Sequence, residues 1–341
     1  MRLRPITHTR SKQLIPIANK PVLFYAIDAL LQAGICEIGI VVGDTGREIK
    51  KAVEKAYGRG AGITYIRQSR PLGIAHAIRI SEDFIGKSRF VVFLGDNLIN
   101  GSLFPYADSF QSSGADAMVL LAKVPDPTLF GVAIMKKGKV IGLVEKPKRP
   151  PSNYALAGIY FFSSGIFKAV KSIGLSKRGE YEITDSIQYL MDTGRHVISR
   201  KISGWWKDTG KIEDLLEANK LILDGTVRKI EGEIDEKSKI SGSVRIDGAR
   251  VVNSVIKGPS VIGRGSSIIN SEIQPYTSIG PGCVIEGSSI GYSIVMARSS
   301  ITGITSGLGH CLIGEEAEVK FRSGKTPYSS LHLGDCSRVS L

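Results

Sequence analysis

The sequence predicts two parts, an α/β domain with a mixed sheet over residues 1–225 and a parallel β-helix with a C-terminal tail over residues 226–341. Helical and strand patterns alternate along the first part, which is typical of a sheet covered by helices. Near its middle several strand patterns follow one another, which indicates antiparallel additions to that sheet. In the second part helical periodicity ends and aliphatic residues recur every six positions, which predicts stacked coils of parallel strand.

Local signals bound the first elements. Leu23, Ile27, Leu30 and Leu31 form a helical stripe, and Gly34 follows where a helix would end. Because the apolar run at 90–94 is short and unbroken, we expect a strand buried on both faces within a parallel sheet. The same patterns predict strands over 37–42, 63–66 and 90–94 and helices over 47–57 and 74–84.

The middle of the chain is richer in strands. A hairpin turn is predicted over 136–139, where lysines surround a glycine. Strands are predicted over 117–122, 131–134, 140–145 and 156–162, and helices over 164–173, 182–193 and 212–223.

The β-helix is predicted from two overlapping series of residues. Each hexad can bury its aliphatic residue only by stacking on the next coil. One series with a step of six is Val255, Val261, Ser267, Ile273, Ile279 and Ile285, and a second, one residue later, is Ile256, Ile262 and Ile268.

Composition favours an enzyme with small anionic substrates. The formal net charge is +13, but the basic residues are scattered and form no block interleaved with aromatics, which argues against a nucleic-acid partner. The sequence has no apolar run of membrane-spanning length and no secretory signal, so we expect a cytoplasmic protein with no membrane partner. Its four cysteines are widely spaced without a Cys-x-x-Cys motif, which argues against a zinc site and a disulfide framework.

Several motifs combine charged or amide side chains with glycine or proline, and three of them fall where predicted strands end. In open α/β sheets this is the edge at which ligands bind. The motifs are Arg2-Leu-Arg-Pro-Ile-Thr7 with Lys12–Pro21, Gln68-Ser-Arg-Pro-Leu-Gly73 with Ile-Ala-His-Ala77, Leu94-Gly-Asp-Asn97, Val144-Glu-Lys-Pro147, Arg178-Gly-Glu-Tyr-Glu-Ile-Thr-Asp185 and Trp205-Trp-Lys-Asp-Thr-Gly210.

In this order the motifs resemble those of the glucose-1-phosphate thymidylyltransferase family, in its long form with an appended hexapeptide β-helix. The resemblance covers essentially the whole chain. It implies a Rossmann-like nucleotidyltransferase domain, a left-handed β-helix and Mg²⁺ as cofactor. The implied reaction converts dTTP and α-D-glucose 1-phosphate to dTDP-glucose and pyrophosphate, for dTDP-deoxysugar biosynthesis. The acceptor phosphate would attack the α-phosphorus in line, without an enzyme-bound intermediate.

The resemblance assigns roles on the nucleotide side. Arg2 and Lys12 would act as catalytic cations on the α-phosphate and the pyrophosphate, and Gln13 would bind the nucleotide. Gln68 and Pro71 belong to the base-reading loop, where the Gln68 amide can pair with the imide edge of thymine or uracil. Gly73 lets the backbone approach the base, although a simple turn before a helix would have the same local shape.

It also assigns the metal and sugar sites. Asp96 and Asp208 would bind magnesium together with phosphates and water, and Asp96 would also contact the nucleotide. Glu145 would accept hydrogen bonds from sugar hydroxyls, and Lys146 would hold the acceptor phosphate. The glycines expected to line the sugar pocket are Gly131 and Gly158.

One departure from the family pattern affects the expected activity. The family's first strand and Gly-rich loop would precede Arg2, and that loop's amides would hold the triphosphate. We therefore expect the printed chain to be poorly stable or nearly inactive, with the true start upstream. The alternative is a non-catalytic relative that binds a sugar nucleotide and regulates. Assaying the printed chain beside an N-terminally extended version distinguishes the two.

The sequence does not decide between two pyrimidine nucleotides. UTP presents the same imide edge to Gln68 as dTTP, so a UTP-dependent uridylyltransferase fits equally at that contact.

Acyl transfer by the β-helix is disfavoured, because His310 and His332 lie at or beyond its irregular end. The histidines, His76 among them, show no metal-ligand spacing, so we expect solvated or packing roles. The flanks of a β-helix also suit association into a homo-oligomer.

Overall fold

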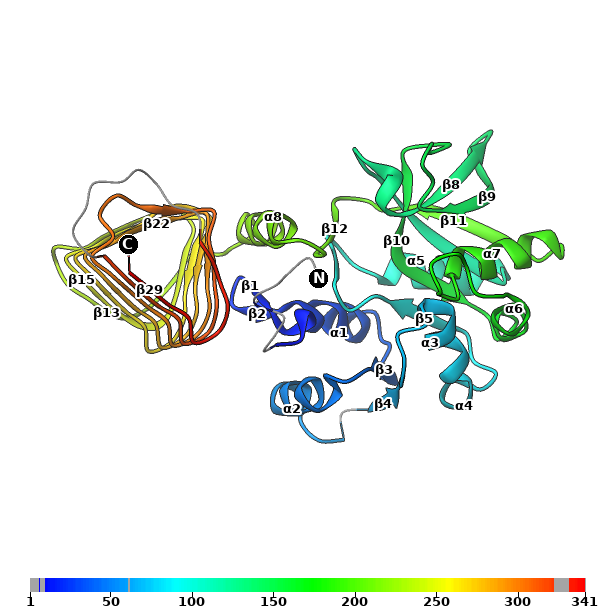
Figure 1. The fold of residues 1–341 in the computed structure, drawn as a ribbon, viewed down its shortest axis with the longest axis horizontal. Helices are drawn as coiled ribbons and strands as arrows, with labels where there is room; N and C mark the ends of the chain where they lie inside the picture. Colours follow the sequence, from blue (N-terminus) through cyan, green and yellow to red (C-terminus); the bar gives the residue numbers. More distant parts are fainter. Residues whose placement is uncertain (1–5, 7–9, 61, 322–330, 341) are drawn as a thin grey trace. The chain divides into compact units, whose positions relative to one another are not determined.

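The computed structural model describes residues 6, 10–60, 62–321 and 331–340. Within these residues no helix is long and apolar enough to cross a membrane. The chain forms two compact units (Figure 1), here called the α/β unit, Leu23–Asp208, and the β-helix unit, Met1–Val22 with Thr209–Leu341. The expected boundary after residue 225 cuts the sequence once, whereas the β-helix unit also includes the first 22 residues. That domain boundary stays a prediction.

A six-stranded mixed sheet lies at the centre of the α/β unit. Its strand order is β11-β7-β10-β8-β9, and β5 pairs with β10. Only β11 and β7 run parallel, and the other pairs of this sheet are antiparallel. The strands are β5 (Phe90–Phe93), β7 (Ala117–Lys123), β8 (Gly131–Lys136), β9 (Lys139–Glu145), β10 (Tyr154–Phe162) and β11 (Val197–Lys201).

Helices pack on this sheet through apolar side chains. Ile78, Val170 and Ile187, from three different helices, share one buried cluster with Leu121 and Phe162 of the sheet. Burial of this kind contributes about 25 cal/mol per Å² of apolar area. The helices that begin in or just before the unit are α1 (Val22–Gln32), α2 (Gly46–Tyr57), α3 (Ile74–Ile80), α4 (Glu82–Ile85), α5 (Phe104–Ser113), α6 (Ile166–Ser172) and α7 (Ile183–Asp192).

The expected parallel sheet is present only in part. Strands β3 (Ile38–Val42) and β4 (Ile63–Arg67) pair in parallel as a separate two-stranded sheet. β5 instead joins β10 in antiparallel register, and its four residues are half-buried rather than buried on both faces. The apolar run predicted the strand correctly but could not predict which strand would pair with it.

Two predictions about turns have different outcomes. The hairpin over 136–139 is confirmed, because Lys136 pairs with Lys139 and both turn residues, Lys137 and Gly138, have positive φ. The single helix over 74–84 is wrong. It divides into α3 and α4 at Ser81, whose hydroxyl donates to the Ala77 carbonyl at 2.8 Å.

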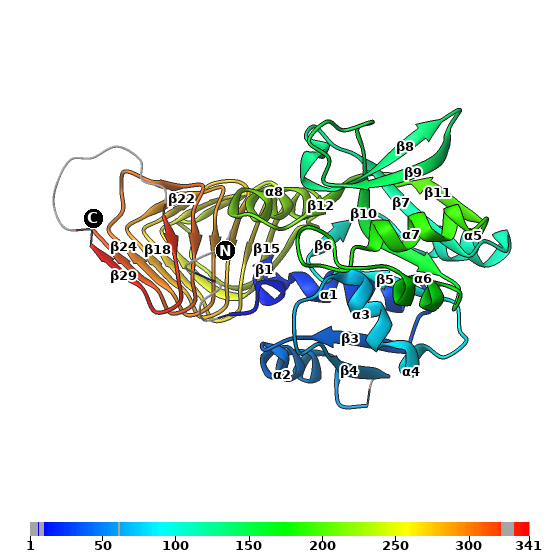
Figure 2. The same ribbon diagram turned by 45° about the vertical axis from the view of Figure 1, so that its right-hand side comes forward.

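The β-helix is built of short parallel strands stacked coil upon coil, as Figures 1 and 2 show. Ile246 pairs with Ile262, Ile262 with Ile279, and the column continues through Val295 and Ile313. The strands are β13 (Lys229–Ile234), β14 (Lys239–Ser241), β15 (Val244–Val252), β16 (Val255–Lys257), β17 (Ser260–Ile262), β18 (Ser267–Ile269), β19 (Glu272–Ile273), β20 (Thr277–Ile279), β21 (Val284–Glu286), β22 (Ser289–Gly291), β23 (Ile294–Val295), β24 (Ser300–Thr302), β25 (Leu308–Gly309), β26 (Leu312–Ile313), β27 (Glu318–Lys320), β28 (His332–Leu333) and β29 (Arg338–Ser340).

The core of the β-helix uses parts of both predicted series. Ile256, Ile262 and Ile268 lie in the core, and so do Ile273, Ile279 and Ile285. Val261 instead packs against Ala18 and Leu223, because neighbouring residues of a strand point to opposite faces. The inward position therefore changes series between Ile268 and Ile273, where the step shortens.

Residues near the N-terminus belong to the β-helix unit. A hairpin of β1 (Pro16–Ile17) and β2 (Lys20–Pro21) turns at Ala18 and Asn19, both at positive φ. The buried amide of Asn219, on α8 (Ile212–Leu223), accepts from the Ala18 N–H at 2.9 Å and the Ser278 hydroxyl at 2.7 Å. It also donates to the Tyr276 carbonyl at 3.2 Å. One side chain thus joins the hairpin, α8 and the β-helix.

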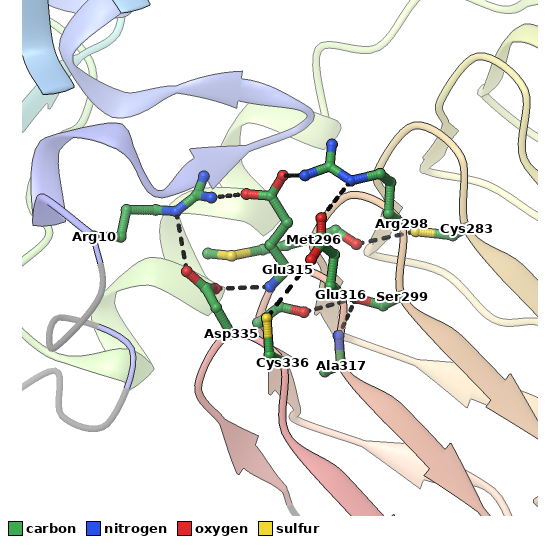
Figure 3. Close-up of polar contacts among 11 residues, drawn as sticks. Arg10, Cys283, Met296, Arg298, Ser299, Glu315, Glu316, Ala317, Asp335 and Cys336 are labelled. Atoms are coloured by element: carbon green, nitrogen blue, oxygen red, sulfur yellow. Dashed lines mark hydrogen bonds and ion pairs between the residues drawn. The ribbon is translucent and has the colours of Figure 1, made fainter.

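Arg10 makes a second attachment of this segment. Its guanidinium pairs with Glu315 and Asp335 at one end of the β-helix (Figure 3). Arg298 pairs with Glu315 as well. The thiol of Cys336 lies nearby and donates to Glu316, and no disulfide forms among the described cysteines.

Candidate active site

The predicted base-reading loop lies where β4 ends and α3 begins. The Gln68 N–H donates to the Val42 carbonyl at 2.8 Å, which fixes the loop to the end of β3. Pro71 is exposed, and Gly73 caps α3 with φ +93, a conformation that favours glycine. The Gln68 amide nitrogen donates to the Gly73 carbonyl at 3.2 Å, so the loop closes on itself.

Residues 176–184 pack against this loop. The Tyr181 N–H donates to the Leu72 carbonyl at 2.9 Å, and the Ala75 N–H donates to the Tyr181 carbonyl at 3.2 Å. A Cβ added at Gly73 would lie 2.6 Å from the Tyr181 oxygen. The loop can therefore approach this segment only because residue 73 has no side chain.

The same segment holds Glu145 at the end of β9. The Glu145 carboxylate accepts from Arg178 at 3.2 Å and from the Thr184 hydroxyl at 3.2 Å. Burial, and secondly the charge of Glu182, raise the pKa of Glu145 above its ordinary value. Lys146 follows at φ +39, with its Nζ 4.0 Å from the Glu145 carboxylate and its side chain 39% exposed. An acceptor and a cation thus lie side by side at this strand end.

The two expected pocket glycines lie where side chains crowd the backbone. A Cβ at Gly131 would lie 3.2 Å from the Glu145 carboxylate and 2.8 Å from Thr184. One at Gly158 would lie 2.9 Å from the Asn97 side-chain oxygen, and Gly158 has φ +65. Gly131 is therefore next to the carboxylate cluster, and Gly158 is next to the two acidic strand ends described below.

Asp96 and Asp208 lie on neighbouring strand ends. β12 (Trp206–Asp208) pairs with β6 (Asn97–Ile99), with Asp208 opposite Asn97. The Asn97 amide donates to Asp96 at 3.0 Å and accepts from the Trp206 indole at 2.8 Å. Both aspartates are half-buried. A magnesium ion prefers a few carboxylate oxygens and takes its other ligands from phosphates and water, and this pair fits such a site.

The described residues hold no group of three or more His, Cys, Asp or Glu side chains arranged to bind a metal. Two carboxylates alone do not make a complete ion cage. A magnesium ion here would depend on substrate phosphates for part of its coordination, which is typical of nucleotide-dependent enzymes.

The catalytic cations expected near the N-terminus are only partly described. Lys12 begins a short 3₁₀ turn (Lys12–Leu14), and the Ser11 hydroxyl donates to the Gln13 side-chain oxygen at 2.7 Å. Both Lys12 and Gln13 belong to the β-helix unit. Arg2 lies outside the described residues.

A model of the nucleotidyl transferase family matches residues 1–225. The chain belongs to this family. A glucose-1-phosphate thymidylyltransferase of Streptomyces griseus is 46% identical over 100% of this chain and 96% of that protein. The low-salt glycan biosynthesis nucleotidyltransferase Agl11 of Haloferax volcanii is 43% identical over 100% of this chain and 97% of its own length. The UTP–glucose-1-phosphate uridylyltransferase AglF of the same organism is 34% identical over 67% of this chain and 95% of its length.

Solved structures also resemble this nucleotidyl transferase family member. A Bacillus anthracis protein provisionally described as a glucose-1-phosphate thymidylyltransferase, in complex with a sucrose, has a TM-score of 0.61 and 38% identity. The match covers 67% of this chain and 93% of that one. A UDP-glucose pyrophosphorylase complexed with UDP-glucose has a TM-score of 0.58 and 27% identity, covering 65% and 93%. The expectation of a nucleotidyltransferase fold followed by a parallel β-helix is confirmed.

Within the α/β unit, the structure gathers the predicted residues into two groups. Gln68 and Gly73 connect to Glu145 through residues 176–184, while Asp208 lies opposite Asn97, the neighbour of Asp96, where β6 and β12 pair. Sequence reasoning missed Asn97 and Trp206 as partners of the acidic pair. Both lie within the motifs around the two aspartates, but no spacing rule showed that they touch. It also assigned His76 no specific contact.

Proposed function

We propose that this chain transfers a thymidylyl group from dTTP to α-D-glucose 1-phosphate, giving dTDP-glucose and pyrophosphate. The observation that carries the proposal is the network through residues 176–184, which connects the Gln68 loop to Glu145 in one compact unit. The loop whose Gln68 amide would pair with the base and the Glu145 carboxylate that would bind the sugar both contact this short segment. The full-length similarity to glucose-1-phosphate thymidylyltransferases supports this assignment of Gln68 to the nucleotide and of Glu145 to the sugar.

On the nucleotide side, Gln68 would pair with the base and Gly73 would admit it close to the backbone. Lys12 would neutralise the negative charge of the triphosphate, including the charge that develops on the leaving pyrophosphate. Arg2 is assigned the same task by the resemblance. Gln13, beside Lys12, would bind the nucleotide as well.

On the sugar side, the Glu145 carboxylate would accept hydrogen bonds from two hydroxyls of the hexose. Its contacts with Arg178 and Thr184 hold the carboxylate in one orientation before the sugar binds. The exposed ammonium group of Lys146 would hold the acceptor phosphate. The gain from holding two substrates in a fixed orientation is large, because a bimolecular step becomes effectively unimolecular.

Asp96 and Asp208 would hold magnesium, which supplies charge neutralisation at the reacting phosphates when bound. The chain's own contribution is the placement of these carboxylates. Asn97 holds Asp96 through a 3.0 Å hydrogen bond and is itself held by Trp206. A cytoplasmic location, expected from the sequence, and self-association through the flanks of the β-helix stay predictions, and this chemistry does not require them.

UTP is the second candidate nucleotide. Uracil and thymine share the imide edge, and AglF, named for UTP, matches two thirds of this chain. The higher identity and full coverage of the thymidylyltransferases favour dTTP.

Initial rates with each triphosphate and glucose 1-phosphate test the proposal, with pyrophosphate release as the signal and the sugar nucleotide identified by mass. We expect a higher kcat/KM with dTTP than with UTP. A clear preference for UTP would support the uridylyltransferase instead. No sugar nucleotide from either triphosphate, with this chain and with an N-terminally extended version alike, together with tight binding of dTDP-glucose, would support the regulatory alternative.

A further inference from the structure

The amide of Gln68 is held in one orientation by two neighbours. Its nitrogen Nε2 lies 3.2 Å from the Gly73 carbonyl oxygen and 3.0 Å from His76 Nδ1. A carbonyl oxygen can only accept, so the group that faces Gly73 must be the NH₂ end. His76 Nδ1 then accepts the other amide hydrogen, and the imidazole carries its own proton on Nε2.

The surroundings of His76 favour this neutral form. Burial of the ring, followed by the charges of Arg79 and Arg70, lowers the pKa of His76 below its ordinary value. The ring also stacks on Tyr181, with centroids 6.2 Å apart and planes 22° apart. A charged imidazolium would place a donor against the NH₂ group, so the neutral ring is the one that fits.

The result is that Gln68 offers its carbonyl oxygen, Oε1, as the group left for a ligand. Among the described residues Oε1 takes part in no hydrogen bond. Thymine and uracil carry a hydrogen on N3, whereas cytosine has a lone pair there. An acceptor fixed at this position therefore pairs with the first two bases and opposes the third.

We propose that His76 is a specificity-determining positioning residue: by fixing the orientation of the Gln68 amide, it makes the site select imide pyrimidines over cytosine. The proposal rests on the proposed function, in which Gln68 faces the base. Without the His76 acceptor only Gly73 would hold the NH₂ end, and the amide could rotate to offer NH₂ to cytosine N3. Selectivity would then fall, while the catalytic groups would be unchanged.

The test compares His76→Leu, which removes the acceptor, with His76→Asn, whose side-chain oxygen can take the place of Nδ1. For wild type and both variants, kcat/KM is measured with dTTP, UTP and CTP. We expect His76→Leu to lower the ratio of dTTP to CTP by about tenfold, the value of roughly one hydrogen bond. His76→Asn should restore most of the ratio.

A merely structural role for His76 would lower all three values together and leave the ratio unchanged, which would overturn the proposal. Equal ratios in the two variants would overturn it as well. Binding of dTTP and CTP alone, measured by calorimetry, gives the corresponding ratio of affinities without turnover. If wild type binds dTTP selectively but makes no sugar nucleotide, the proposed function fails while the role of His76 is still decided.

Discussion

The guanidinium of Arg178 lies 3.2 Å from the carboxylate of Glu145, which ties the end of β9 to the segment that leads into α7. Thr184, on α7 itself, donates to the other carboxylate oxygen. The sugar-binding candidate is therefore oriented by residues far from it in sequence, and Tyr181, which lies between those two in the chain, contacts the base-reading loop. A substitution of Glu145 should therefore weaken the use of glucose 1-phosphate more than the binding of dTTP.

Replacing Glu145 with Gln should lower kcat/KM for glucose 1-phosphate by about 10- to 100-fold, because hydrogen bonds to a charged acceptor contribute roughly 1.5–3 kcal/mol. The KM for dTTP should change little. Glu180→Gln is the matched control, since Glu180 contacts Arg178 at 3.4 Å without touching Glu145. Steady-state kinetics with each substrate varied in turn check this. An equal loss of kcat/KM in Glu180→Gln would show that the placement of Arg178, and not the Glu145 carboxylate, determines how well glucose 1-phosphate is used.

The pH dependence of stability should also depend on Glu145. Its raised pKa means that the folded state binds the proton more tightly than the unfolded state, so this carboxyl lowers the free energy of unfolding as pH rises. The decrease begins near the ordinary carboxyl pKa and is complete above the raised one. We expect Glu145→Gln to be at least as stable as wild type at neutral pH, with the advantage disappearing in acid.

Urea unfolding of both proteins between about pH 4 and about pH 8 measures this difference across the ordinary carboxyl range. Curves that stay parallel over the whole range would contradict the prediction. A variant that is less active but no less stable would fit a carboxylate retained for binding.

Gly73→Ala should disrupt the base-reading loop. The added methyl group would meet the Tyr181 oxygen at 2.6 Å, and the backbone at φ +93 and ψ 175, a region almost confined to glycine, adds strain of about 1–3 kcal/mol. We expect a raised KM for dTTP and a lowered melting temperature. Gly34→Ala is the control, because Gly34 also has positive φ but no atom within 4 Å of an added Cβ. If both variants bind dTTP equally well, the close approach to Tyr181 is not what places the loop.

Strong periodicity made the elements predictable, but pairing depended on contacts distant in sequence. The hexad repeat predicted the β-helix, yet the core follows one series up to Ile268 and the other from Ile273. Helix α5 was missed because Ser109, Ser112 and Ser113 interrupt its apolar pattern. These differences arise where local patterns are weak or where two patterns overlap.

The candidate site shows the same limit. Asp96 was found because it ends an apolar strand, and Asp208 because it lies in an aromatic turn. That Asp208 lies opposite Asn97 depends on the β6–β12 pairing, which links residues far apart in the chain. The contact of His76 with Gln68 depends on how the loop folds back, so residue spacing could not predict it.

Asn219→Leu should destabilise the β-helix unit. The substitution leaves the Ala18 N–H and the Ser278 hydroxyl without their buried acceptor, at a cost of about 1–3 kcal/mol for each such group. Ser278→Ala removes a single partner and should cost less. Urea unfolding gives the free energy of unfolding of each variant, and hydrogen exchange at the Ala18 amide shows whether the hairpin has lost its protection. Unchanged exchange in Asn219→Leu would show that the hairpin is held by other contacts.

The central claim is that two acidic side chains, Asp96 and Asp208, hold the magnesium that nucleotidyl transfer requires. The most direct measurement is the initial rate of dTDP-glucose formation by wild type and by the Asp96→Asn, Asp208→Asn variant as magnesium is titrated. We predict that the variant loses about 10²- to 10³-fold in kcat at saturating metal, the scale of removing one electrostatic contact from a transition state, or more. Undiminished synthesis by a folded double variant would contradict the account.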